Sequence, residues 1–65
     1  MTIRLNGATH ELTAKTVDEL LTDLGYDSRF VAVAVNKNCV RRSAFGATPL
    51  CDGDEVEVLA PMAGG

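Results

Sequence analysis

The segment from Thr16 to Gly25 carries signals for both ends of one helix, and this restricts the fold more than any other feature of the sequence. Thr16 and Glu19 fit a capping box, in which the Thr16 hydroxyl accepts from the Glu19 amide and the Glu19 carboxylate reaches back to the Thr16 amide. Gly25 suits the left-handed position that follows a helix, and Tyr26 in the next position can pack back on Leu21. The sequence therefore predicts one short helix between these two signals.

The apolar residues of this helix, expected from Val17 to Leu24, recur at the spacing of a single helical face. They are Val17, Leu20, Leu21 and Leu24. Such a stripe packs in a hydrophobic core by default, and it needs no functional explanation.

The chain before the helix has the pattern of a β-hairpin. Residues 2–5 alternate between polar and apolar, and Asn6-Gly7 is a strong signal for a type I′ turn, which needs a positive φ at both central residues. We expect the sole histidine, His10, to be a partly exposed strand residue, because it has no carboxylate or hydroxyl partner that would make it catalytic. The expected cross-strand partners are Leu5 with Ala8, Ile3 with His10, and Met1 with Leu12.

A strand is expected directly after the helix. The β-branched run 30–35 is interpreted as the central strand, with its valines on the helix side and Phe30, Ala32 and Ala34 on the other face. Turn residues 36–38 close this strand.

Two more strands are expected near the C-terminus. The first is a short strand around residues 39–41. After a loop and a turn at residues 52–54, the segment 55–59 alternates again. Its valines, Val56 and Val58, are expected to point to the core, and the opposite face is expected to carry Glu55, Glu57 and Leu59.

The order of elements is therefore hairpin, helix, strand, short strand, strand. This order predicts an α+β fold of the ubiquitin-like β-grasp type, with a mixed sheet of four to five strands and one main helix packed across one face. Residues 1–59 are expected to form this domain. Residues 60–65 are expected to be a flexible C-terminal diglycine tail.

The composition excludes several classes of protein. A chain of 65 residues is one domain with a thin core, and 46% apolar with 23% charged residues is typical of a folded globule. The net charge of −3 argues against nucleic acid and anionic membrane as partners. No segment has the length needed to span a bilayer and the N-terminus lacks a signal-peptide pattern, so we expect a cytoplasmic protein.

Cys39 and Cys51 are the only cysteines in the sequence. With the lone His10 they fall short of the four ligands that a structural zinc site typically needs, so no metal site is expected. In a reducing compartment we expect both to be small, half-buried apolar residues. The alternative is a disulfide or redox pair.

The last six residues, from Ala60 to Gly65, are mostly small and end in two glycines and a carboxylate. Glycine lacks a Cβ atom and loses more entropy on ordering than any other residue, so two in succession contribute no packing. Such an end fits a narrow channel in the active site of a partner. The alternative is a frayed terminus.

The sequence resembles the ThiS family, the sulfur carriers of bacterial thiamin biosynthesis, over essentially its full length. It departs from the family pattern at Arg41, where a proline is frequent, and near Phe45, where a tryptophan is frequent. The matching motifs are Ile3-x-Leu5-Asn6-Gly7, Thr16-Val17-x-x-Leu20-Leu21-x-x-Leu24-Gly25, Val33-Ala34-Val35-Asn36, Val40-x-Arg42-Ser43, Thr48-Pro49-Leu50-x-Asp52-Gly53-Asp54-x-Val56-Glu57-Val58, Pro61 and Gly64-Gly65.

The resemblance implies a cycle on the carboxyl of Gly65. A ThiF-like adenylating enzyme would use MgATP to make an acyl-adenylate, and a persulfide from a donor such as a cysteine desulfurase would displace AMP. The resulting thiocarboxylate would supply sulfur to a ThiG-like thiazole synthase, with Met62, Ala63 and Gly64 threaded into the partner's active site. The chain itself would be a stoichiometric carrier, not an enzyme, with no catalytic residues and no bound cofactor, and a monomer on its own.

Partner docking is expected on the sheet face away from the helix. Leu59 and Phe30 are expected to be exposed apolar anchors next to the tail. Glu57 is expected to steer the chain towards a basic surface of the partner.

Three alternatives remain open on the sequence. The small subunit of molybdopterin synthase (MoaD-like) shares the expected fold and a similar ending, but it is usually longer. A ubiquitin-like protein modifier would join Gly65 to a lysine. A plain interaction module would make no use of its glycines.

Overall fold

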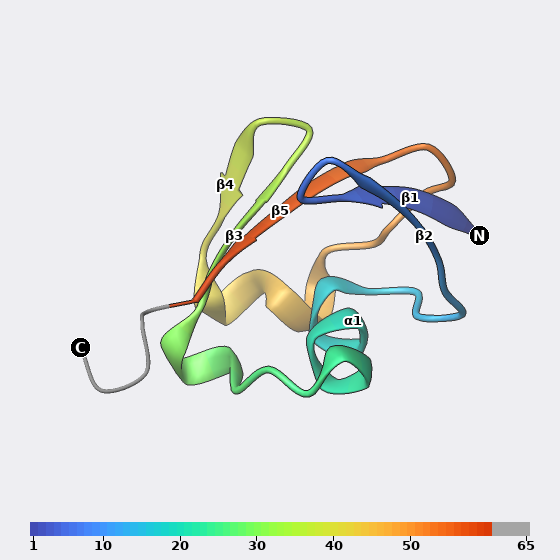
Figure 1. The fold of residues 1–65 in the computed structure, drawn as a ribbon. Helices are drawn as coiled ribbons and strands as arrows, with labels where there is room; N and C mark the ends of the chain where they lie inside the picture. The colour runs from blue at the N-terminus through green and yellow to red at the C-terminus, as the bar shows by residue number, and fades with distance from the viewer. Residues whose placement is uncertain (61–65) are drawn as a thin grey trace.

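The computed structural model describes residues 1–60, which form a five-stranded mixed sheet with one α-helix across one face (Figure 1). The strands lie in the order β2-β1-β5-β3-β4. The elements are β1 (Thr2–Leu5), β2 (Ala8–Glu11), α1 (Val17–Leu24), the 3₁₀ turn η1 (Ser28–Phe30), β3 (Ala32–Val35), β4 (Asn38–Val40), the 3₁₀ helix η2 (Arg42–Ala47) and β5 (Glu55–Leu59). The expected α+β fold is confirmed.

The hairpin β1–β2 has the predicted turn and register. Asn6 and Gly7 have φ values of 49° and 85°, as a type I′ turn requires. Leu5 pairs with Ala8 and Ile3 pairs with His10. Beyond the strands, the Met1 amino group donates to the Leu12 carbonyl and the Leu12 amide donates to the Met1 carbonyl, both at 2.9 Å, so the third predicted pair also forms.

The helix α1 begins and ends where the sequence predicts. The Thr16 hydroxyl accepts from the Glu19 amide at 3.2 Å. The Glu19 carboxylate, however, accepts from the amide of Lys15 at 2.9 Å and not from that of Thr16. Thr16 is extended and forms a β-bridge with Pro49, and this geometry brings the preceding amide within reach of Glu19. The cap is therefore a variant of the predicted capping box.

The C-terminus of α1 closes with the predicted glycine motif. Gly25 has a φ of 81°, and its amide donates to the Thr22 carbonyl at 3.1 Å. The Tyr26 amide donates to the Leu21 carbonyl at 2.9 Å. This pair of bonds is a Schellman motif, which satisfies two carbonyls at the end of the helix.

The interpretation of residues 30–35 as the central strand is wrong in two respects. Strand β3 begins only at Ala32, because the Asp27 carboxylate accepts from the Arg29 amide at 3.0 Å and holds Phe30 in the turn η1. The centre of the sheet is β5, which pairs parallel with β1 and antiparallel with β3. Residue type identifies a buried strand but not its place among the others.

The core lies between the sheet and α1. It includes Phe45 from η2, a segment where the sequence predicts only a loop. The buried residues are Ile3, Ala14, Val17, Leu20, Leu21, Val31, Val33, Phe45, Leu50, Val56 and Val58. As predicted, the valines of β3 and β5 face α1, although Val35 at the end of β3 is only partly buried.

The expectation that the cysteines are half-buried is wrong. Cys39 and Cys51 are both exposed free thiols. Cys39 pairs with Ala34 on the sheet face away from α1, because alternation along β4 turns its neighbour Val40 towards the core instead. Cys51 lies in the loop before β5.

No helix within residues 1–60 is long and apolar enough to cross a membrane.

Candidate functional site

The candidate site is the C-terminal end of the central strand β5, where Leu59 is followed by Ala60. The residues predicted to carry sulfur or to thread into a partner, Met62, Ala63, Gly64 and Gly65, lie outside the described residues. The structure describes residues 1–60, called the head from here on, which would present them. It shows which hydrogen bonds hold β5 in place.

The end of β5 is held by the side chain of Asn6. Strand β1 pairs with β5 only through Arg4 with Glu55 and Leu5 with Val56. Beyond that point, Asn6 Oδ1 accepts from the Val58 amide at 2.8 Å, and Asn6 Nδ2 donates to the Val58 carbonyl at 3.3 Å. The side chain thus supplies two bonds to the backbone of Val58 that a longer β1 would otherwise have made.

The start of β5 is held by a second asparagine, Asn36, in the turn between β3 and β4. Its amide donates to the Glu55 carbonyl at 2.7 Å, and its Oδ1 accepts from the Glu55 amide at 3.0 Å. Its Nδ2 donates to the Asp54 carboxylate at 3.0 Å. Asn36, like Asn6, has a positive φ, here 51°.

Sequence reasoning treated both asparagines as turn formers and missed this second role. The turn signal explains a positive φ equally well with asparagine, aspartate or glycine. Of these three residues, only asparagine has both a donor and an acceptor in its side chain, so it can bond to a backbone N–H and a backbone carbonyl together. Asparagine at the first position of both turns is the one feature of the sequence that marks these residues, but it does not identify the strand that they hold.

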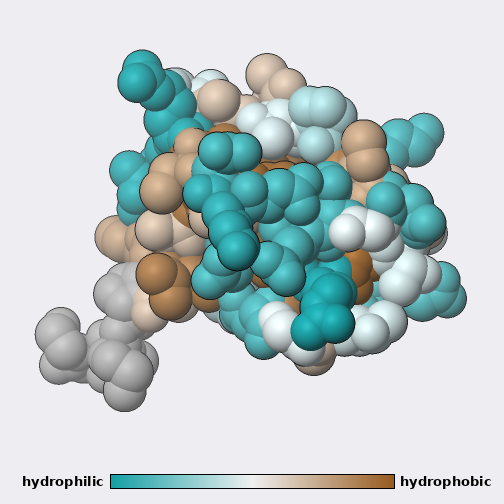
Figure 2. Space-filling view, turned by 90° about the horizontal axis from the view of Figure 1, so that it is seen from above, coloured by the Kyte–Doolittle hydropathy of each residue, from teal (hydrophilic) through white to brown (hydrophobic). Residues whose placement is uncertain are grey.

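The sheet face away from α1 carries the predicted docking residues Leu59 and Glu57. Leu59 is 72% exposed and pairs with Ala32, while Glu57 pairs with Ala34. Figure 2 looks onto this face and shows hydrophobic surface beside the point where the chain leaves the head, with hydrophilic surface over the middle of the sheet. A role of these residues in docking stays a prediction.

Phe30, the third predicted docking residue, lies in η1 and not on the strand. It is 58% exposed, and the guanidinium carbon of Arg29 lies 5.2 Å from the centre of its ring. Because Val31 alone separates η1 from β3 and Ala32 pairs with Leu59, both apolar side chains belong to the end of the sheet from which Ala60 leaves.

Two concave regions lie beside the C-terminal half of β5. The larger, an open groove of about 510 Å³, exists because β1 stops at Leu5 while β5 continues. It is lined by Asn6, Gly7, Glu55, Glu57, Val58 and Leu59. The smaller, of about 90 Å³, is lined by Ala32, Val33, Ala34, Cys39, Glu57 and Leu59. Both are open surfaces, suited to contact with a macromolecule more than to enclosing a small one.

The main electrostatic feature near this end is the pair Asp27 and Arg29. Arg29 Nη2 lies 2.7 Å from Asp27 Oδ2, and Arg29 Nε donates to Asp27 Oδ1 at 3.0 Å. The hydrogen bonds from the Arg29 side chain and amide lower the pKa of Asp27 to about 2, and the same pairing raises the pKa of Arg29. Both groups are exposed, so the pair is screened by solvent.

Other polar candidates are dispersed. His10 is exposed on the edge strand β2, opposite Ile3. Across residues 1–60, no three His, Cys, Asp or Glu side chains come together in a way that could hold a metal ion.

A mixed five-stranded sheet with one helix across it, and a central last strand that leads into a small-residue tail, defines the class of ubiquitin-like β-grasp proteins. Within that class, the model of the ThiS family matches residues 3–65. The chain belongs to the ThiS family, which confirms the resemblance found in the sequence.

Individual relatives agree with this assignment. The chain is 41% identical over 61 residues to the sulfur carrier protein ThiS of Thermus thermophilus, covering 94% of this chain and 95% of that one. It is 39% identical to a thiazole synthase of Paramagnetospirillum magneticum and 41% identical to one of Magnetococcus marinus, each over 66 residues. It covers only 20% of the length of either thiazole synthase.

A solved structure shares the fold. The crystal structure of the thiamine biosynthesis protein ThiS from Geobacter metallireducens superposes with a TM-score of 0.84 at 36% identity, and the match covers 100% of both chains.

Proposed function

We propose that this chain is a sulfur carrier of thiamin biosynthesis whose Gly65 carboxyl is converted to a thiocarboxylate. The observation that carries the proposal is the match to the ThiS family, which extends through the last residue and therefore includes Gly64-Gly65. It favours the thiamin branch over the molybdopterin branch and over a protein modifier. The architecture of the head supports it, because the central strand leads directly into the reactive end.

The chemistry follows from the weakness of a carboxylate as an electrophile. A ThiF-type partner would join the Gly65 carboxylate to AMP from MgATP, releasing pyrophosphate and creating a good leaving group. The terminal sulfur of a persulfide then attacks the carbonyl carbon, and AMP leaves. A second thiol attacks the remaining S–S bond, which releases the thiocarboxylate and leaves a disulfide on the donor.

The head contributes presentation and no catalytic group. Asn6 and Asn36 fix β5 at both ends, so the direction in which Ala60 leaves the sheet is set by the fold. A segment of six residues spans at most about 20 Å when fully extended, which is the farthest that Gly65 can reach from the head. An error of about 1 Å at a reacting group can cost roughly 100-fold in rate, so a rigid base for the segment is useful.

The partners proposed are a ThiF-type adenylating enzyme, a persulfide donor such as a cysteine desulfurase, and a ThiG-type thiazole synthase. The last has support of its own, since two thiazole synthases each contain a segment similar to this entire chain. Segments that occur joined in one protein and separate in another are natural candidates for association. The docking face proposed on this chain includes Leu59, Phe30 and Glu57.

The experiment that tests the function is intact-mass spectrometry. The chain, incubated with the adenylating enzyme, MgATP and a persulfide donor, should gain the mass of one oxygen-to-sulfur exchange. A variant that lacks Gly65 is the matched control and should show no exchange. If the wild-type mass stays constant with every such partner, the carrier function is wrong.

A further inference from the structure

The register of the sheet places Arg41 in the same cross-strand row as the exposed apolar residue Leu59. Val40 on β4 pairs with Val33 on β3, so Arg41 comes next to Ala32, which pairs with Leu59 on β5. Arg41 keeps an extended backbone, with φ −71° and ψ 149°. Alternation then puts its side chain on the face away from α1, two strands or about 10 Å from Leu59.

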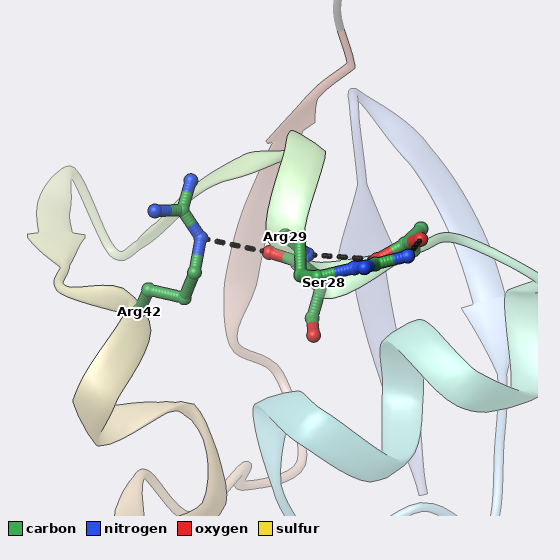
Figure 3. Close-up of polar contacts among 4 residues, drawn as sticks. Ser28, Arg29 and Arg42 are labelled. Atoms are coloured by element: carbon green, nitrogen blue, oxygen red, sulfur yellow. Dashed lines mark hydrogen bonds and ion pairs between the residues drawn. The ribbon is translucent and has the colours of Figure 1, made fainter.

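The next residue, Arg42, presents a guanidinium group at the same end of the sheet. Its Nε donates to the Ser28 carbonyl at 2.9 Å, which ties the start of η2 to η1. Figure 3 shows the two terminal nitrogens of Arg42 pointing away from Ser28. Within residues 1–60 the bond to Ser28 is the one hydrogen bond of the Arg42 side chain, so these terminal nitrogens remain available as a fork.

The charge at this end has the opposite sign to that of the whole chain. The net charge of the chain is −3, yet three of its six lysines and arginines, Arg29, Arg41 and Arg42, come together here. Asp27 already neutralises Arg29. Arg41 and Arg42 thus add two positive charges at the end of the sheet where Leu59 and Phe30 are exposed.

We propose that Arg41 and Arg42 form a docking site for carboxylate groups on the surface of the thiazole synthase. This inference rests on the proposed function and deepens it. An arginine fork matches a carboxylate in two parallel bonds, and arginine next to exposed apolar residues is typical of protein–protein interfaces. Two exposed arginines on an acidic chain are too few to hold nucleic acid or a membrane, whose binding grows with the number of basic contacts.

Arg41 and Arg42 also give the sheet face away from α1 a positive end and a negative part. Glu57 lies in the row next to Leu59, on the side remote from Ala60, whereas Arg41 and Arg42 lie at the end from which Ala60 leaves. A partner surface complementary to both signs can approach in only one orientation. Docking in that orientation would direct the C-terminal segment to the same place on the partner at each encounter.

The test measures binding of the purified thiazole synthase to the intact chain by surface plasmon resonance at several salt concentrations. Arg41→Gln and Arg42→Gln should each lower the association rate about threefold, and the double variant about tenfold, with a weaker salt dependence. Lys37→Gln is the matched control, because it removes one charge at the opposite end of β3 and should change the rate by less than about twofold.

Arg42→Lys separates charge from bracing, because lysine keeps the charge but lacks the guanidinium Nε that bonds Ser28. An association rate near the wild-type value in Arg42→Lys, which keeps the charge but not the fork, supports the docking site when Arg41→Gln lowers that rate at an unchanged melting temperature. A double Gln variant that binds as the wild type does at low salt would overturn it. The carrier function is tested separately, by the gain of sulfur in the wild type. The two proposals can therefore fail independently.

Discussion

The side chain of Asn6 completes the hydrogen bonding of Val58, a residue 52 positions away in the sequence. It accepts from the Val58 amide and donates to the Val58 carbonyl, at the point where β1 has ended and β5 continues. A residue in the first turn of the chain therefore fixes the strand that presents its last residues. The same residue adopts the positive φ that the turn needs, so turn geometry and strand anchoring are joined in one side chain.

Replacing Asn6 by glycine should destabilise the head by about 1–2 kcal/mol, because two hydrogen bonds to β5 are lost. Glycine keeps the positive φ without strain, so the turn itself is preserved in this variant. Asn6→Asp is the matched control: it retains the acceptor for the Val58 amide and should lose less. Urea unfolding followed by circular dichroism measures both. Equal stability of Asn6→Gly and wild type would show that solvent replaces these bonds at no cost.

The Asp27–Arg29 pair predicts a pH-dependent contribution to stability. The pKa of Asp27 falls from 3.8 to about 2 in the folded chain. A lowered pKa means that the contribution is present above the unfolded value and is lost as the pH falls from about 4 towards 2. Asp27→Asn keeps an acceptor for the Arg29 amide but removes the charge. Its melting temperature should lie below that of the wild type at pH 6, and the gap should close near pH 2.

Arg29→Gln tests the same ion pair from the other side, because it removes the guanidinium group and leaves the Asp27 carboxylate. Its gap to the wild type should close over the same pH range. Differential scanning calorimetry of the three proteins decides the matter. A gap that is constant from pH 6 to pH 2 in either variant would mean that the ion pair does not contribute to folding.

The two exposed cysteines offer a matched test of the docking face. Cys39 lies beside Ala34, which pairs with Glu57, whereas Cys51 lies in the loop before β5. A bulky maleimide on Cys39 in a Cys51→Ser background should weaken binding of the thiazole synthase about tenfold or more, because even one buried anchor is worth more than 1.4 kcal/mol at a hot spot. The same label on Cys51 in a Cys39→Ser background should leave binding unchanged.

Leu59→Asp tests the centre of the same face without a label, and it should weaken binding while the head stays folded. Cys39→Ser with Cys51→Ser should still form thiocarboxylate, because the sulfur acceptor is the Gly65 carboxyl. If the Cys39 and Cys51 labels act alike and Leu59→Asp binds normally, the interface lies elsewhere. If the unlabelled double serine variant folds but gains no sulfur, a thiol takes part in the chemistry.

The parts of the fold that could be predicted from the sequence are those with local signals. The Asn6-Gly7 turn set the register of its hairpin, and the Thr16 and Gly25 caps set the helix boundaries, because each signal lies within a few residues of its effect. The central place of β5 and the packing of Phe45 from η2 depend on residues far apart in the chain. The same holds for Asn6 with Val58, so the anchoring of the candidate site could not be found from local pattern.

The last prediction separates the reactive end from the fold. All the buried core residues of the head lie between Ile3 and Val58, so removal of Gly65, addition of one residue after it, or Gly64→Val should leave thermal unfolding nearly unchanged. Activity should respond in the opposite way. One residue moves the carboxyl by about 3.3–3.6 Å, which takes the reacting carbon out of line with the α-phosphate of ATP.

Gly64→Val leaves the length unchanged and tests width instead, because a β-branched side chain adds bulk where a channel must admit the chain. We expect all three variants to fold and to lose adenylation. Pyrophosphate exchange with the adenylating enzyme, measured beside circular dichroism, tests this. Gly64→Ala is the graded control: its single methyl group should reduce exchange less than valine does. Wild-type exchange in the deletion, the extension and Gly64→Val together would mean that the diglycine end has no part in the reaction.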